Sequence, residues 1–78
     1  MLSERIDVIS YSGRKGEERP VTFILRGLRI YVVELLEQWI EEGSGDRVRR
    51  RCFRVRGSDR NSHRICYDES DQEWYYRS

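Results

Sequence analysis

The segment of residues 21–33, VTFILRGLRIYVV, constrains the fold of this chain more than any other stretch. Two runs of β-branched and aliphatic residues flank Arg26 and Gly27, and an X-Gly pair readily adopts the positive φ angles of a two-residue hairpin turn. Such a turn places Leu25 opposite Leu28 and fixes the register of the hairpin. One face is then apolar throughout, and it comprises Val21, Phe23, Leu25, Leu28, Ile30 and Val32. The other face is mixed, and it comprises Thr22, Ile24, Arg26, Arg29, Tyr31 and Val33.

The length of the chain, 78 residues, fits one β-rich domain spanning residues 1–78. A domain of this size buries only about 60% of the surface of its unfolded chain, which leaves little room for a deep catalytic cleft. Charged residues make up 37% of the chain and aromatic residues 12%, a combination that favours a small folded domain with an ionic surface. The net charge is +1, so the chain as a whole does not attract polyanions strongly.

Other short runs rich in β-branched and aromatic residues are separated by polar turns, a pattern typical of strands. These expected strands cover residues 6–11, 48–56, 63–68 and 73–77. Residues 34–42 are ambiguous, because their apolar side chains fit one face of a helix and also a long strand. Helix propensity favours the helix. Continuity with residues 30–33, and the absence of a helix cap before Glu34, favour a strand that is bent or bulged near Leu35 and Leu36, and we expect the strand.

Together these elements predict an all-β fold, a small antiparallel meander of five to six strands that forms a barrel or a strongly twisted sheet. A short helix over residues 34–42 is the alternative within that fold. The turn at residues 57–61 is expected to pair Phe53 with Ile65 and Cys52 with Cys66. The expected core consists of Ile6, Val8, Val21, Phe23, Leu25, Leu28, Ile30, Val32, Trp39, Phe53, Val55, Ile65, Tyr67 and Trp74.

Short motifs along almost the whole chain resemble a small bacterial family of uncharacterised single-domain proteins. They are ISYSG, RPVTF, Gly27, Tyr31-x-Val33, a Leu-x-x-x-Trp motif ending at Trp39, FRVR, and YD followed by WYY. Members of that family sometimes occur beside, or fused to, DNA-polymerase-like repair proteins, so the resemblance implies a context in DNA metabolism and no mechanism. The chain departs from the family pattern at residues 59–61, where Asp-Arg-Asn stands in place of the expected Asp-Gly turn.

Acidic and basic residues are segregated in the middle of the chain. Residues 34–46 contain five acids and no base, whereas residues 47–64 contain eight arginines and one acid, Asp59. Two interpretations fit this pattern. In one of them the arginines form a ribbon that contacts a phosphate backbone, with a tyrosine that stacks on an unpaired base. The candidate contacts are Arg49, Arg50, Arg54, Arg56 and Tyr31. In the alternative interpretation the arginines pair with glutamates of the preceding segment, namely Glu34, Glu37, Glu41 and Glu42.

Arg14 and Lys15 are further candidates, because Gly13-Arg14-Lys15-Gly16 matches the GxxG loop that clamps phosphates in KH domains. In KH domains that loop joins two helices, whereas here it follows a strand and precedes Pro20. We therefore expect a glycine-permitted surface loop rather than a KH-type clamp.

No constellation of residues predicts catalysis, a metal site or a cofactor. Cys52, His63 and Cys66 supply three ligands where a structural zinc site needs four, and His63 and Cys66 project from opposite faces of one strand. A nucleophile needs a base beside it, and the only histidine, His63, shares a strand face with Ile65 and Tyr67, where a packed or rim histidine is far more common than a catalytic one. The chain lacks a signal peptide and an apolar span long enough for a bilayer, which predicts a cytoplasmic protein with two reduced thiols.

The sequence therefore predicts a small binding domain that is not an enzyme, and nucleic acid is the leading candidate ligand. The alternative function is protein–protein interaction or assembly, through an exposed sheet edge or through the aromatic residues 74–76. We expect a monomer or a weak homodimer with no membrane partner.

Overall fold

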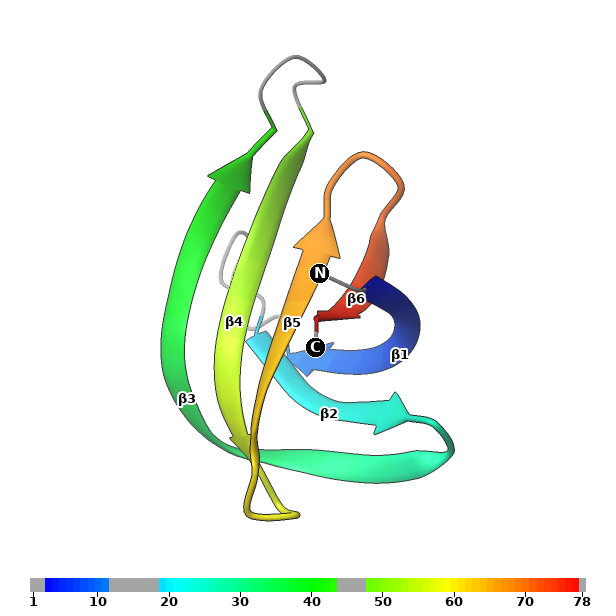
Figure 1. The fold of residues 1–78 in the computed structure, drawn as a ribbon, viewed down its shortest axis with the longest axis vertical. Helices are drawn as coiled ribbons and strands as arrows, with labels where there is room; N and C mark the ends of the chain where they lie inside the picture. The colour runs from blue at the N-terminus through cyan, green and yellow to red at the C-terminus, as the bar shows by residue number, and fades with distance from the viewer. Residues whose placement is uncertain (1–2, 12–18, 44–47, 78) are drawn as a thin grey trace.

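The computed structural model describes residues 3–11, 19–43 and 48–77, and they form an antiparallel barrel of six strands (Figure 1). The strands are β1 (Ser3–Tyr11), β2 (Arg19–Leu25), β3 (Leu28–Glu42), β4 (Arg49–Gly57), β5 (Ser62–Asp68) and β6 (Glu73–Arg77). Each strand pairs with the next one along the chain, and β6 pairs with β1 to close the barrel. The predicted all-β meander is confirmed, in its barrel form.

The hairpin between β2 and β3 has the predicted register. Leu25 pairs with Leu28, and Phe23 pairs with Ile30. The turn residues Arg26 and Gly27 have φ angles of 51° and 83°. Two positive φ angles in succession match the right-handed twist of the flanking strands, which is why an X-Gly turn fits here.

β3 is one continuous strand that changes partner along its length. Leu28–Tyr31 pairs with β2, and the strand pairs with β4 from Val32 to Glu42. The register with β4 shifts between Val32 and Glu34 and again between Leu35 and Glu37, so β3 contains two irregularities of the bulge type. Bulges bend a strand, and Figure 1 shows β3 turning a corner beside the end of β4, where Val32 pairs with Gly57. The prediction of a bent strand over residues 34–42 is confirmed, and the helical alternative is wrong.

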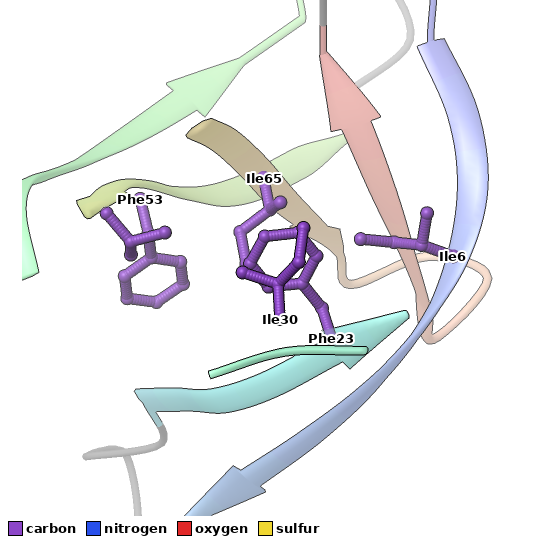
Figure 2. Close-up of a cluster of buried hydrophobic side chains, with 6 residues drawn as sticks. Ile6, Phe23, Ile30, Phe53 and Ile65 are labelled. Carbon is purple, nitrogen blue, oxygen red and sulfur yellow. The ribbon is translucent and has the colours of Figure 1, made fainter. Parts of the chain in front are cut away.

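β1 changes partner in the same way, because Ser3–Ile6 pairs with β6 and Asp7–Tyr11 pairs with β2. The barrel thus consists of two sheets that share two bent strands, β1 and β3. The core lies where the inner faces of both sheets meet, and Figure 2 shows its side chains converging from β1, β2, β3, β4 and β5. Its buried members are Ile6, Phe23, Ile30, Phe53, Val55 and Ile65, all of them predicted.

Two residues predicted for the core are exposed. The register between β1 and β2 passes from Ile9–Thr22 to Ser10–Pro20, so Val21 is an extra residue and its side chain is 43% exposed. Leu28 directly follows the turn, at the end of the hairpin, and is 57% exposed. Strict alternation along the strand predicted both residues as buried, because alternation takes no account of bulges or of where a sheet ends.

The register between β4 and β5 pairs Phe53 with Ile65 and Cys52 with Cys66, as predicted. The two cysteines lie on the face opposite to Phe53 and Ile65, because successive side chains alternate across a strand. Their Cα atoms are 4.0 Å apart, and their sulfur atoms form a disulfide. The prediction of two reduced thiols is therefore wrong: the pairing that the sequence predicts also brings the two thiols into bonding position.

We expect Gly57→Ala to lower the free energy of unfolding by about 1–3 kcal/mol through overpacking. A Cβ at residue 57 would lie 2.5 Å from Cγ2 of Ile30 and 2.7 Å from Oδ1 of Asp59, and Ile30 is only 1% exposed. Urea denaturation followed by tryptophan fluorescence measures the change. Gly27→Asn is the control, because no atom lies within 4 Å of a Cβ there and asparagine tolerates positive φ. Equal stability of Gly57→Ala and the wild type would contradict the close approach.

Reduction of the disulfide is expected to destabilise the protein by about 3 kcal/mol, because the bond closes a loop of about fifteen residues in the unfolded chain. The two cysteines are 14 positions apart in the sequence. Urea denaturation with and without dithiothreitol measures the loss, and the variant with both cysteines replaced by alanine should show no response to the reductant. Titratable thiols in the unreduced folded protein would contradict the bond.

Candidate interaction surfaces

All four β4 arginines predicted to contact nucleic acid pair with carboxylates of the same chain. The pairs are Arg49–Glu69 at 3.4 Å, Arg50–Asp68 at 3.3 Å, Arg54–Glu37 at 2.6 Å and Arg56–Glu34 at 3.1 Å. Two of these acids are on β3, directly across from β4, and the other two are at the end of β5 and in the turn that follows it. The predicted basic ribbon is therefore largely neutralised by neighbouring strands and turns.

The alternative interpretation of the sequence was that residues 34–42 and β4 pair through opposite charges. Two of its four glutamates form such pairs. Glu34 and Glu37 bind Arg56 and Arg54, respectively. Glu41 instead binds Arg77 of β6 through both of its carboxylate oxygens, each at 2.7 Å. Glu42 forms no ion pair within residues 3–11, 19–43 and 48–77.

A cluster that we call the disulfide cluster covers the outer face of β4 and β5. Trp39, Cys52, Cys66 and Tyr75 form one row across β3, β4, β5 and β6. The indole Nε1 of Trp39 donates a hydrogen bond to Glu41 at 2.9 Å. The disulfide lies in the middle of this row and is buried, because its two cysteines are 0% and 1% exposed. Trp39 was predicted for the barrel core, and the structure places it in this cluster instead.

Hydrogen bonds and arginines in this region favour the ionised carboxylates. The hydrogen bonds from Arg77 and Trp39 lower the pKa of Glu41 below its ordinary value, and burial opposes them only in part. The hydroxyl and backbone N–H of Ser70 lower the pKa of Asp68, with a smaller contribution from Arg50. Both carboxyls therefore stay ionised at lower pH than ordinary glutamate and aspartate side chains, which suits a structural role.

His63 lies inside the barrel between two hydrogen-bond partners. Its Nδ1 is 2.8 Å from the Tyr76 hydroxyl, and its Nε2 is 2.9 Å from Asp59 Oδ2. Burial raises the pKa of Tyr76. Desolvation acts to raise the pKa of Asp59, but hydrogen bonds from His63 and Asn61 outweigh it and lower that pKa overall. These hydrogen bonds fasten the β4–β5 turn to the barrel. The sequence predicts a packed or rim position for His63 but neither of its two partners.

A second surface covers the outside of β1, β2 and the first part of β3. Ile9, Thr22 and Tyr31 form one row across the three strands, and the side chains of Ile9 and Tyr31 are 59% and 54% exposed. Val33 is 67% exposed, beyond Tyr31 along β3. The β4–β5 turn lies beside Tyr31, because Ser58 donates its backbone N–H to the Tyr31 carbonyl and accepts the Tyr31 N–H at its hydroxyl.

Two arginines that form no ion pair with the described residues border this surface. Arg29 is two residues from Tyr31, on the same side of β3. Arg60, in the β4–β5 turn, lines a shallow depression together with Val33 and Ser58. Neither arginine forms an ion pair with any residue that the structure describes. We define the Tyr31 surface as Ile9, Arg29, Tyr31, Val33 and Arg60. Thr22, in the same row as Ile9 and Tyr31, is buried.

The structure therefore separates the predicted contacts. Tyr31 lies near Arg56, because Val32 pairs with Gly57, whereas Arg49 pairs with Glu42 at the far end of β3. Arg14 and Lys15 lie outside the described residues.

Arg29 and Arg60 were not singled out from the sequence. Arg29 was at least placed on the same hairpin face as Tyr31, but only the fold brings the β4–β5 turn alongside that face.

Comparison of the chain with protein-family models, with curated proteins and with solved structures gives no match. The resemblance to a small bacterial family therefore stays a prediction. No helix long and apolar enough to cross a membrane occurs in the described part of the chain.

Because the folded pKa of Glu41 is depressed, its stabilising effect is complete above the ordinary value of 4.5 and is lost as the pH falls through the lower folded value. We expect Arg77→Gln to raise the pKa of Glu41 toward the ordinary value, so that the loss begins at higher pH. NMR titration of the glutamate side-chain carboxyl carbons measures this shift. Arg54→Gln is the control, and an equal shift of Glu41 in both variants would contradict the assignment.

Proposed function

We propose that this protein binds single-stranded nucleic acid through the Tyr31 surface. The observation that supports the proposal most is the exposure of Tyr31, at 54%, beside Arg29 and Arg60, two arginines that form no ion pair within the described residues. Sequence-independent binding of single strands combines aromatic rings that stack on bases with basic side chains that follow the backbone. The Tyr31 surface offers both on one side of the barrel.

Arginines that already pair with carboxylates are poorer phosphate ligands than unpaired ones, because a phosphate must displace the acid. This reasoning moves the proposed contact from the β4 arginines to the surface around Tyr31. The guanidinium groups of Arg54 and Arg56 each have a glutamate within 3.1 Å. A single exposed ring with few cations suits an unstacked, flexible strand, and it offers no long basic stripe for a duplex.

The binding should be weak and sensitive to salt. Two phosphate contacts on a single strand predict a slope of about −1.4 for the logarithm of the association constant against the logarithm of salt concentration. Fluorescence anisotropy with labelled oligothymidylate and oligouridylate measures the affinity and the slope. Absence of binding to both probes at low salt would overturn the proposal.

Substitutions test whether the Tyr31 surface is the contact. Tyr31→Ala should weaken binding by about 5- to 150-fold, the equivalent of about 1–3 kcal/mol for one stacked base, whereas Tyr31→Phe retains the ring and should bind like the wild type. The double variant Arg29→Gln/Arg60→Gln should lower the salt slope. Arg49→Gln/Arg54→Gln removes the same charge from paired positions and should leave the slope unchanged. An equal effect of both double variants would contradict the choice of surface.

A further inference from the structure

The two edges of β3 differ in how far they are paired. One edge pairs with β4 over Val32–Glu42, whereas the other pairs with β2 only as far as Tyr31. Beyond Tyr31, none of the described strands pairs with that second edge. Figure 1 shows the later part of β3 along the left margin of the molecule, with β4 on its other side. β2 leaves β3 at the corner, and this divergence creates the free edge.

The free edge is regular over Glu37–Glu42. In this segment β3 pairs with β4 residue for residue, from Glu37–Arg54 to Glu42–Arg49. In an antiparallel ladder every second residue turns its N–H and C=O away from its neighbour, so half of these backbone groups point toward the free edge. A segment of this length matches a typical strand of about five to six residues, and it can template one more.

Natural sheets usually protect such an edge with charged side chains, most often lysine, or with proline or a bulge. The register irregularities of β3 lie before Glu37, and Glu37–Glu42 contains neither lysine nor proline. Ile40, in the middle of the segment, is 46% exposed. The segment therefore has the regularity and the apolar side chain of a pairing site, and glutamates are its only charged residues.

The charges on this edge indicate what can pair with it. Glu37 uses only Oε1 for its contacts with Arg54, so its Oε2 remains free within the described residues. Glu42 forms no ion pair there either. A second copy of the chain would bring its own three glutamates along the same seam, and like charges on opposing strands destabilise the pairing. A strand with basic side chains would instead meet complementary charge.

We infer that the free edge of β3, Glu37–Glu42, binds an extended basic segment of another protein by strand addition. In this mode backbone hydrogen bonds supply the affinity, and alternate side chains supply the choice of partner. Arginine or lysine in the added strand contacts Glu37 or Glu42, and an aliphatic residue packs beside Ile40. The site is separate from the Tyr31 surface, so it adds a protein partner to a nucleic-acid-binding domain.

Hydrogen exchange measured by NMR tests this inference with a synthetic peptide of alternating threonine and arginine as the probe. In the free protein, alternate backbone amides of Glu37–Glu42 should exchange quickly, and excess peptide should slow them. The same peptide with methylated backbone nitrogens keeps its charge but loses its donors, and it should not slow them. A peptide of alternating threonine and glutamate should bind at least about tenfold more weakly. Equal binding by the methylated peptide, or no slowing by the first peptide, would overturn strand addition.

Variants separate the edge from the rest of the surface. Ile40→Lys places a like charge on the edge and should weaken peptide binding by at least about tenfold. Glu42→Gln should weaken it by about two- to fivefold, whereas Asp7→Asn removes one acid from exposed β1 and should have no effect. Tyr31→Ala should bind the peptide like the wild type, so a failed nucleic-acid proposal leaves this test intact. Slow amides together with a dimeric mass in the absence of peptide would identify a second copy as the occupant and overturn the inference.

Discussion

The corner in β3 determines the architecture of this barrel. Two register irregularities between Val32 and Glu37 allow one strand to leave β2 and continue beside β4. Without the bend, the hairpin of β2 and β3 could not lie across the sheet of β4, β5 and β6 and enclose Phe23 and Ile30 between the two layers. The same bend moves the later part of β3 away from β2. The core, the outer face around Tyr31 and the free edge are therefore consequences of this one bend.

Charge pairing then determines which parts of the surface remain available. The arginines of β4 are held by acids from β3, from the end of β5 and from the turn after β5. The pairs of Arg49, Arg54 and Arg56 are exposed. Exposed ion pairs contribute little to stability, with a median of about 0–1 kcal/mol each, but they reduce the positive field above the strand. Cations without an acidic partner in the described chain, such as Arg29 and Arg60, then have a larger influence on a polyanion than their number suggests. A chain of nearly neutral net charge can in this way present distinct acidic and basic regions.

Much of the fold could be predicted from the sequence, because local chemistry and alternation agreed in the central hairpin. Arg26-Gly27 determined the turn, and the turn determined that Phe23 pairs with Ile30. Residues 34–42 form a strand despite their helix propensity, because β4 offers a ladder of backbone hydrogen bonds and cover for Leu35. The exposure of Val21 could not be predicted, because strict alternation of inward and outward side chains does not show that β2 contains an extra residue. The candidate site was harder still, because ion-pair partners depend on which strands become neighbours.

β3 remains a strand through its corner and exchanges β2 for β4 as its partner. Nuclear Overhauser contacts between backbone protons of the labelled protein in solution test it most directly. We expect contacts of Phe23 with Ile30 and of Trp39 with Cys52, and none between β2 and residues 35–42. Helical contacts between residues three apart over residues 34–42, or backbone contacts that continue from β2 along the whole of β3, would contradict it.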